Sequence, residues 1–394
     1  MNIFFYDLIR GKNIGTESTH IYEVLNNIIN QGHNVLLYHP VEQRFNRASI
    51  VNTKPNCWGN LALTIPIIGI CLSYAAEVRF FLRAIFLLRS EKKKIDIVYY
   101  RHTLFNFGYW LARWLRVPAI KEVNGIVANE MQVTGEASGF ALEIINRIER
   151  ATIGKANRII VVTSKLKETL IDEYNVPEES IEVIENGANT DMFRPMHMET
   201  AKKELNLNPE HSYVCFIGNF TGWQGLEYLI KCAPHVLKAC PDARFLMVGD
   251  GILKGRLSEM ARELGISEMV IFTDMVPYEK VPLYINASEV CVVPKKHLKS
   301  GYSPLKLYEY LACEKAVVAS KVEGFECLEE QKAGVLVEPE NPDELAKAII
   351  KLMKDEKLRN EMGRNGREYV VKNHSWESIA RQIADVFRAS ILLN

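Results

Sequence analysis

The sequence predicts an α/β protein with two doubly wound parallel sheets, and three observations support this fold class. First, 394 residues with 48% hydrophobic content exceed one ordinary core and are enough for two. Second, short apolar or β-branched runs alternate with amphipathic stretches along the chain. Third, the alternation is interrupted at residues 186–211, a polar, turn-rich segment without a strand. We therefore expect two Rossmann-like domains that face a ligand-binding cleft.

The first domain is expected to span residues 1–191, with the boundary near Asp191. The apolar runs predict strands at Ile3–Tyr6, Asn34–Tyr38, Ile97–Tyr100, Ala119–Val123, Ile159–Val162 and Ile181–Ile184. The helical periodicity predicts helices at Thr19–Gln31, Leu104–Leu115, Phe140–Ile153 and Leu166–Tyr174.

The second domain, residues 192–374, repeats this alternation. Strands are expected at Tyr213–Ile217, Arg244–Val248, Val270–Phe272, Val290–Val293, Ala316–Ala319 and Gly334–Val337. Helices are expected at Leu226–Ala239, Lys254–Leu264, Val281–Asn286, Leu305–Ala312 and Asp343–Lys354. A last helix, residues 375–394, packs back on the first domain or stays with the second, and its periodicity does not distinguish these alternatives.

The charge and cysteine content narrow the function classes. Lys and Arg number 48 and so do Asp and Glu, so nothing global favours a nucleic-acid binder. The eight cysteines are scattered, without a Cys-x-x-Cys pair that would indicate a zinc or redox centre. We expect a reducing, cytoplasmic environment, and the start "MNIFFYDLIRGKNIGT" does not have the pattern of a signal peptide.

Residues Leu61–Leu88 form the most apolar segment. Pro66 and Gly69 interrupt it, and charged residues follow from Glu77, so it is short and broken for a transmembrane helix. One alternative is a strand and a helix that cover a sheet face. The other is a peripheral contact with the inner face of the cell membrane.

The stretch "SGYSPLKLYEYLACEKAVVAS", Ser300–Ser320, indicates an anion site. Ser303 can cap a helix whose first residue is Pro304. Lys306 then lies in the first turn, where a cation is unfavourable unless an anion binds there. Glu309 follows on the same helix face.

A glycine-containing loop in the same domain indicates the same chemistry. "FIGNFTGWQG", residues 216–225, follows a strand and opens a helix, so Gly218, Gly222 and the helix start near Gln224 could approach a phosphate. "VGDGILKG", residues 248–255, has the wrong spacing for a dinucleotide fingerprint and does not predict NAD binding.

Several of these motifs together resemble one family. "RIIVVTSKLKETLIDEYNVPEESIEVIENGANTDMFRP", residues 158–195, is similar to the segment that ends the first domain of retaining GT-B glycosyltransferases of family four. The resemblance continues through "FIGNFTGWQGLEYLI", "FLMVGDG", "VPLYINASEVCVVP" and "SPLKLYEYLACEKAVVAS" to a helix that contains Trp376. It also includes "GTESTHIYEVL" and "INQGHNVLLY", so it covers nearly the whole chain.

The resemblance implies an enzyme that transfers a sugar, with retention of anomeric configuration, from a UDP- or GDP-sugar to a glycan or lipid-linked acceptor. It implies no cofactor and no metal, because Lys306 and helix N-termini would neutralise the diphosphate. Glu309 would hold the ribose hydroxyls. The donor-binding residues that it implies are Gly218, Asn219, Gly222, Gln224, Gly225, Met275, Val276, Gly301, Tyr302, Ser303, Pro304, Leu305, Lys306 and Glu309.

On the acceptor side, Gly15 and Thr16 resemble the family's first loop, and Arg101 and His102 follow a predicted strand. Asn124, with Glu122 beside it, stands where the family often has a histidine, and both are catalytic candidates.

The sequence departs from the family pattern at three positions: Gly301 replaces a glutamate, Gln224 replaces a lysine and Asn124 replaces the histidine. These departures leave open a non-catalytic nucleotide-sugar binding protein. A separate alternative is a sugar-nucleotide epimerase of the same architecture, which would need acid/base carboxylates or histidines in the cleft.

Overall fold

The computed structural model describes residues 1–6, 16–39, 49–52, 66–90, 94–134, 137–297 and 304–393. The chain forms two compact units, residues 1–185 with 379–394 and residues 186–378. The division between Glu185 and Asn186 falls a few residues before Asp191, where the sequence analysis placed it. From Ile379 onward the last helix belongs to the first unit.

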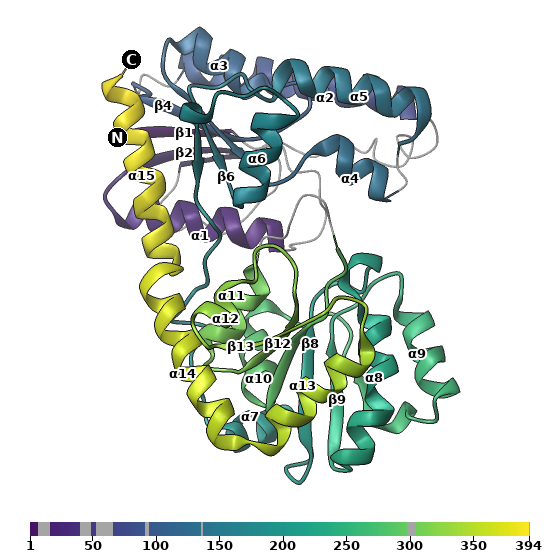
Figure 1. The fold of residues 1–394 in the computed structure, drawn as a ribbon. Helices are drawn as coiled ribbons and strands as arrows, with labels where there is room; N and C mark the ends of the chain where they lie inside the picture. The colour runs from purple at the N-terminus through teal and green to yellow at the C-terminus, as the bar shows by residue number, and fades with distance from the viewer. Residues whose placement is uncertain are drawn as a thin grey trace. The chain divides into compact units, whose positions relative to one another are not determined.

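The first unit contains a parallel seven-stranded sheet with strand order β3-β2-β1-β4-β5-β6-β7 (Figure 1). Its strands are β1 (Asn2–Tyr6), β2 (Asn34–His39), β3 (Ser49–Asn52), β4 (Ile97–Arg101), β5 (Ala119–Val123), β6 (Arg158–Val161) and β7 (Ile181–Val183). Its helices are α1 (Thr16–Asn30), α2 (Pro66–Ser90), α3 (Phe107–Leu115), α4 (Val127–Thr134), α5 (Gly139–Thr152), α6 (Ser164–Asp172), η1 (Glu178–Ser180) and α15 (Trp376–Leu392).

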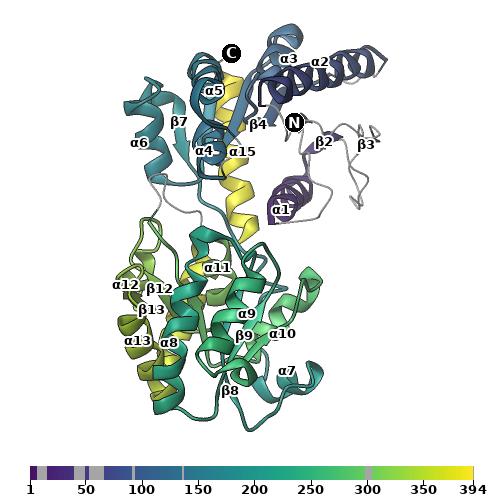
Figure 2. The same ribbon diagram turned by 90° about the vertical axis from the view of Figure 1, so that its right-hand side faces the viewer.

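The second unit contains a parallel six-stranded sheet with strand order β10-β9-β8-β11-β12-β13 (Figure 2). Its strands are β8 (Ser212–Ile217), β9 (Ala243–Val248), β10 (Val270–Phe272), β11 (Val290–Val293), β12 (Val317–Ser320) and β13 (Gly334–Val337). Its helices are α7 (Met198–Glu204), η2 (Gly222–Gln224), α8 (Leu226–Ala239), α9 (Lys254–Glu263), η3 (Ser267–Met269), η4 (Tyr278–Lys280), α10 (Val281–Asn286), α11 (Leu305–Ala312), α12 (Cys327–Glu330), α13 (Pro342–Lys354) and α14 (Glu356–Asn373). Two doubly wound parallel sheets confirm the predicted fold class.

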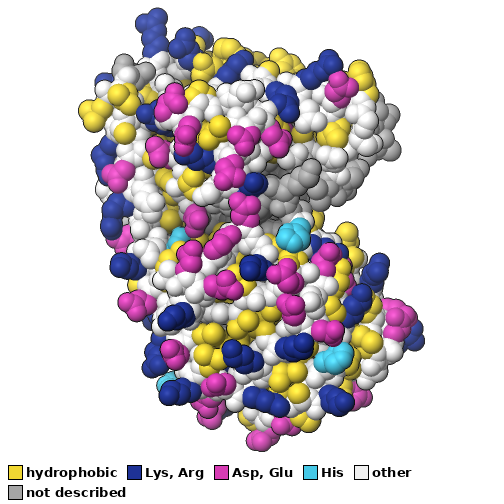
Figure 3. Space-filling view, viewed as in Figure 1, with side chains coloured by type: hydrophobic (Ala, Val, Ile, Leu, Met, Phe, Trp, Pro, Cys, Tyr) yellow, Lys and Arg dark blue, Asp and Glu magenta, His cyan; other side chains and the backbone are white. Residues whose placement is uncertain are grey.

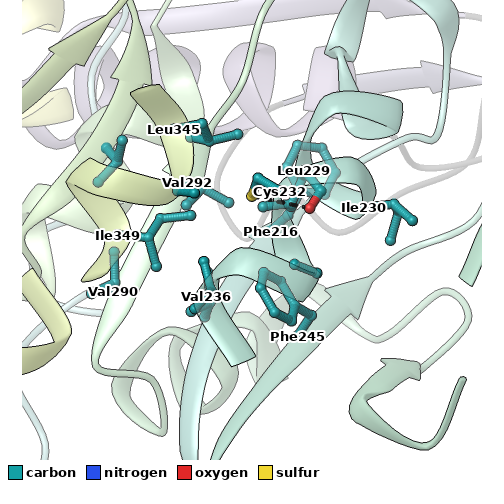
Figure 4. Close-up of a cluster of buried hydrophobic side chains, with 14 of the residues drawn as sticks. Phe216, Leu229, Ile230, Cys232, Val236, Phe245, Val290, Val292, Leu345 and Ile349 are labelled. Atoms are coloured by element: carbon teal, nitrogen blue, oxygen red, sulfur yellow. Dashed lines mark hydrogen bonds between the residues drawn. The ribbon is translucent and has the colours of Figure 1, made fainter. Parts of the chain in front are cut away.

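The strands form where they do because they are buried on both faces, which a parallel sheet covered by helices requires. In the second unit, Phe216, Phe245 and Val292 point to one face and pack against α8 and α13 (Figure 4). Cys215, Leu246 and the other alternating residues point to the opposite face, against α10 and α11. Each strand therefore reads as a continuous apolar run, which is the signal that located it in the sequence.

Local caps set the helix starts on the covering layer. Asn341 accepts a hydrogen bond from the Glu344 backbone N–H at 3.1 Å, and Pro342 follows at the first helical position of α13. A side-chain oxygen of this kind satisfies a backbone donor that the helix leaves free.

The segment from Pro66 differs from the expectation. Residues 66–90 form one continuous helix, so the expected helix is present and the interruption expected at Pro66 and Gly69 is wrong, while residues 61–65 lie outside the described part. The reason is that Pro66 occupies the first position of the helix, where its missing N–H has no partner to lose. None of the helices in the described part of the chain combines the length and apolar character that crossing a membrane requires.

One strand, β3, and four helices, α4, α7, α12 and α14, were not expected either. β3 is a four-residue edge strand, too short to give a clear alternation. α14 packs against α11 and carries so many charged residues that its apolar stripe is faint.

Candidate functional site

The strand order of the second unit creates a topological switch point between β8 and β11, where the chain connections leave in opposite directions. Ligands of open α/β sheets bind at the carboxyl ends of the strands at such a point. Gly218 directly follows β8 and Lys295 follows β11. The predicted glycine loop and one of its neighbouring lysines therefore meet at the expected end of the sheet.

Two glycines of this loop are required by close approaches. A Cβ at Gly225 would lie 1.7 Å from the Pro294 carbonyl oxygen, and Gly225 has a positive φ of 67°. A Cβ at Gly218, where φ is 140°, would lie 2.7 Å from the Lys306 Nζ. Gly222 faces open space. Glycine at 218 therefore leaves room for the lysine amine at the end of β8.

The "VGDG" segment supports this loop. The Gly218 N–H donates to the Val248 carbonyl at 2.9 Å, and the Phe220 N–H donates to the Asp250 carbonyl at 2.8 Å. A Cβ at Gly249 would lie 2.2 Å from the Gly218 carbonyl oxygen. These glycines thus let two backbone loops pack together. Packing therefore explains why the "VGDG" segment contains glycines that resemble a dinucleotide-binding motif.

The helix that carries Lys306 spans Leu305–Ala312, the range that the periodicity predicted, but its cap lies one residue later than expected. α11 starts at Leu305 and Pro304 is its N-cap, so the expectation of Pro304 as the first helical residue is wrong. A helix end shifts by a residue easily when its cap is not a hydrogen-bonded side chain. Gly301, Tyr302 and Ser303, which include the predicted cap, lie outside the described residues. Lys306 still lies in the first turn.

The Lys306 ammonium group lies in an environment that disfavours its charge. Its Nζ donates to the Gln224 Oε1 at 3.0 Å and lies 4.2 Å from the centroid of the Phe216 ring. Burial lowers the pKa of Lys306 to about 7, although the Glu309 carboxylate acts to raise it. Gln224, which replaces the family's lysine, therefore holds the remaining lysine in place.

A second lysine shares this region. Lys295 is buried after β11, and burial, followed by the charge of Lys306, lowers the pKa of Lys295 well below its usual range. The two ammonium groups lie close enough for the charge of Lys306 to disfavour that of Lys295, and an anion beside them would stabilise both charges. The arrangement is therefore suited to a phosphate group.

Glu309 lies on the same helix, and its Oε1 accepts a hydrogen bond from the Tyr278 hydroxyl at 2.8 Å. The sequence analysis missed Tyr278, although it follows closely on Met275 and Val276, two of the residues predicted to bind the donor. Met275 is exposed, whereas Val276 packs against the core. The tyrosine orients the carboxylate.

Other loop residues have structural roles. Trp223 packs against the apolar core, and its carbonyl accepts from the Lys296 N–H at 3.2 Å. Lys296 forms an ion pair with Glu227. Asn219 is exposed in the loop.

In the first unit, Glu122 is the centre of a buried polar cluster at the ends of β4 and β5. Its carboxylate accepts a hydrogen bond from the Tyr99 hydroxyl and lies 3.1 Å from His20 Nε2 and 3.6 Å from Arg101 Nε. Burial acts to raise the pKa of Glu122, but His20, Arg101 and Tyr99 together hold it well below its usual range. The predicted Arg101 and Glu122 are thus brought together, and His20 of α1 joins them unpredicted.

Asn124 extends this cluster. Its Nδ2 donates to the Glu122 Oε1 at 2.8 Å. Because a carboxylate only accepts, this contact sets the amide orientation and turns Oδ1 away from Glu122. Oδ1 is buried and has no hydrogen-bond partner in the described part of the chain. A buried acceptor without a donor is an unusual feature that suits a ligand hydroxyl.

His102 takes a different partner from its neighbour Arg101. Its Nε2 lies 2.9 Å from the Glu149 Oε1, and Glu149 also accepts from the backbone N–H groups of Val127 and Ala128 at the start of α4. Burial lowers the pKa of His102, opposed by the hydrogen bond to Glu149. His102 therefore ties the segment after β4 to α5, and the two backbone N–H groups tie α4 to the same carboxylate. Of the predicted first loop, Gly15 lies outside the described residues and Thr16 is the first residue of α1.

Within the described residues, no group of three His, Cys, Asp or Glu side chains is arranged to hold a metal ion.

Comparisons with known proteins cover most of the chain. Residues 18–192 match the family model described as glycosyltransferase family 4, and residues 197–369 match the model described as glycosyl transferases group 1. An uncharacterized glycosyltransferase of Methanocaldococcus jannaschii is 24% identical over 305 residues, 76% of each chain. The D-inositol 3-phosphate glycosyltransferase of Corynebacterium kroppenstedtii is 26% identical over 317 residues, which are 77% of this chain and 69% of the relative.

Solved structures share the fold over the whole chain. The sucrose-phosphate synthase of Thermosynechococcus elongatus has a TM-score of 0.74 at 22% identity, and all of both chains is covered. Anabaena HepE, solved with UDP and glucose, has a TM-score of 0.70 at 17% identity, covering 98% of this chain and 99% of that one.

Proposed function

Because the chain belongs to glycosyltransferase family 4 and is a glycosyltransferase, we propose that it transfers a sugar, with retention, from a UDP- or GDP-sugar to a glycan or lipid-linked acceptor. The observation that carries this proposal is the position of Lys306, whose amine lies against Gly218 at the end of β8 with its pKa lowered to about 7 by burial. We assign this site to the donor diphosphate.

The chemistry follows from leaving-group stabilisation. As the bond between the anomeric carbon and the phosphate oxygen breaks, negative charge builds on the departing diphosphate. Lys306 and Lys295 supply positive charge there, and the loop after β8 supplies backbone N–H groups. This chain's residues would thus perform the neutralisation without a bound metal.

Retention requires the acceptor to attack the anomeric carbon from the same face of the sugar from which the diphosphate departs. The departing phosphate oxygen would accept the proton of the attacking hydroxyl, so no protein carboxylate is needed as the base. The sugar ends bonded to the acceptor oxygen, and the nucleoside diphosphate leaves with the proton.

The ribose is assigned to Glu309. A carboxylate has paired acceptors for two vicinal hydroxyls, and the Tyr278 hydroxyl, 2.8 Å from Oε1, holds it in one orientation. Backbone groups near Met275 and Val276 would contact the base.

The first unit would bind the acceptor and the reacting sugar. Asn124 presents an acceptor atom, and its orientation depends on Glu122 and so on Arg101. We therefore assign Asn124 to a sugar or acceptor hydroxyl, with Glu122 and Arg101 as positioning residues. A location in the cytoplasm, where sugar nucleotides are available, fits this role.

The names of the compared proteins support a sugar-nucleotide donor, but they do not identify which one this chain uses. Anabaena HepE was solved with UDP and glucose, and the Corynebacterium relative is named for inositol 3-phosphate. UDP-sugars are therefore the first donors to test.

The test is thermal unfolding of the purified protein with UDP, GDP, ADP and their sugar conjugates, with and without EDTA. A ligand at about a hundredfold over its Kd adds ~2.7 kcal/mol to the free energy of unfolding. The donor so found is then incubated with acceptor sugars and lipids, and the product's anomeric configuration is read by NMR. Lys306→Met should lose the stabilisation, whereas Lys231→Met, an exposed lysine of α8, should keep it.

Stabilisation without any transfer would favour a non-catalytic binding protein, and a released epimeric sugar nucleotide would favour an epimerase. An inverted product, or loss of activity with EDTA, would refute the retaining or the metal-independent part.

A further inference from the structure

Two neighbouring helices of the first unit carry exposed apolar side chains where a surface is normally polar. On α2, Leu82 is 58% exposed and Phe86 is 77% exposed. On α3, Trp110 and Trp114 are 49% and 41% exposed. Each pair is spaced by four residues, so each lies on one face of its helix. Contiguous exposed apolar area of this kind marks an interaction surface.

The two faces adjoin. α2 and α3 pack against each other and lie side by side in both views (Figures 1 and 2). The Tyr74 ring of α2 lies 5.8 Å from Phe107 at the start of α3, and the Arg89 guanidinium lies 5.7 Å from the Trp114 ring at its end. The helices therefore contribute one continuous surface, called here the α2–α3 surface. It consists of Tyr74, Leu82, Arg83, Phe86, Arg89, Trp110, Arg113, Trp114 and Arg116.

The charges on the α2–α3 surface have one sign. Arg83, Arg89, Arg113 and Arg116 are all exposed. α3 contains no acidic residue, and the single acidic residue of α2, Glu77, is buried and accepts a hydrogen bond from Thr103 at 3.0 Å. In the view of Figure 3, α5 lies in front of α2, so the picture shows a neighbouring face of the first unit, where dark blue and magenta side chains are mixed. The single sign of charge on the α2–α3 surface contrasts with the whole chain, whose formal net charge is zero.

We propose that the α2–α3 surface binds the headgroup region of a bilayer that contains anionic phospholipids. Leu82 and Phe86 would enter the boundary between headgroups and acyl chains, and the two tryptophans would lie at headgroup level with their N–H groups toward water. The arginines would contact lipid phosphates, whose charge they complement.

A second copy of the chain fits this surface less well. A two-fold interface brings identical patches together, so the arginines of one copy would face those of the other without an acidic partner. A bilayer with anionic headgroups supplies the counter-charge and an apolar phase at once. The proposal does not rest on the donor site: nucleotide-dependent stabilisation tests that site and vesicle binding tests this surface, so either can fail alone.

The test is co-sedimentation of the full chain with vesicles of phosphatidylcholine, alone or with about 30 mol% phosphatidylglycerol, at about 0.15 M salt. Binding should need the anionic lipid and weaken at about 1 M salt. Each arginine near a membrane strengthens binding roughly fivefold, so Arg83→Glu with Arg113→Glu should weaken it at least roughly 25-fold. The matched control, Lys238→Glu with Arg256→Glu, makes the same charge change at exposed positions of α8 and α9 and should bind like the wild type.

The apolar contribution has its own pair of variants. Leu82→Ser with Phe86→Ser should reduce binding at least tenfold. Ile252→Ser, at a position 89% exposed in the second unit, should not. Lipids brominated in their acyl chains should quench tryptophan fluorescence, and Trp110→Phe with Trp114→Phe should remove that quenching.

Three results would overturn the proposal: equal binding to neutral and anionic vesicles, equal loss in the matched control, or quenching that persists without the two tryptophans. A dimer in solution that the Arg83 and Arg113 variant dissociates, with no vesicle binding, would instead identify an interface between copies.

Discussion

We expect Lys306 to make the affinity for a sugar nucleotide depend on pH. In the unliganded protein, burial lowers the pKa of Lys306 to about 7, so the amine is half neutral at neutral pH. A bound diphosphate needs the ammonium form and raises this pKa. Binding therefore takes up a proton above about pH 7, and the affinity must fall as the pH rises.

The size of the effect follows from that pKa. We take Lys306 to be fully protonated in the complex, so the affinity is proportional to the fraction of unliganded protein in which Lys306 is protonated. With a pKa of about 7, this fraction and therefore the affinity fall about 30-fold between about pH 6 and about pH 8.5. Lys295, whose pKa is also lowered, would steepen the fall. At the acid end, Lys306→Met should lose one charge-assisted hydrogen bond, about 1.5–3 kcal/mol or roughly 10- to 150-fold in affinity.

Isothermal titration calorimetry with an intact sugar nucleotide measures this directly, because its diphosphate diester does not itself titrate in the range. Repeating it in buffers of different ionisation enthalpy counts the protons taken up. Lys231→Met should keep the wild-type slope, and Lys306→Met should flatten it. A wild-type affinity that is independent of pH, or a Lys306→Met variant with the full slope, would refute the reasoning.

The same lysine affects the stability of the unliganded protein. Its folded pKa of about 7 lies below the usual 10.5, so the unfolded chain binds more protons between these values. The free energy of unfolding should therefore rise as the pH rises from about 7 to 10.5. The destabilisation that the buried ammonium group causes is fully present below about pH 7. Lys306→Met should raise the unfolding midpoint most at low pH, and a midpoint lower than that of the wild type would count against a buried, desolvated amine.

Three further predictions concern the other site residues. Glu309→Ala should abolish any preference for a ribonucleotide over its 2′-deoxy analogue, measured as the ratio of the two Kd values; a ratio that survives would reassign the carboxylate. Gly218→Ala should weaken sugar-nucleotide binding at least tenfold by displacing Lys306, whereas Gly222→Ala, which faces open space, should bind normally in the same assay. Glu122→Gln should lower the free energy of unfolding by about 3 kcal/mol above pH 4.5, because it leaves buried donors and charge without a carboxylate. The pKa of Glu122 in the folded protein lies below 4.5, so the difference in free energy of unfolding between the wild type and Glu122→Gln should shrink in acid. Denaturation curves at several pH values measure this difference, and a constant difference would contradict the reasoning.

Much of the fold was predictable because parallel strands are encoded locally. A strand buried on both faces must be apolar along its whole length, so the runs at β8, β9 and β11 were visible without knowledge of their neighbours. The same rule fails for β3, an edge strand of four residues, and for the start of α2, where Pro66 looks like a break and is the first helical residue.

The sequence by itself determined the fold class and the two local motifs of the proposed donor site, the glycine loop and the first turn that carries Lys306, because each depends on residues a few positions apart. Only the tertiary structure decided how these motifs act. Gln224 meets Lys306 across 82 positions, and Tyr278 meets Glu309 across 31. The depressed pKa of Lys306 and the His20 contact of Glu122 likewise arise from burial and proximity, which depend on how distant segments pack and have no counterpart in the local pattern.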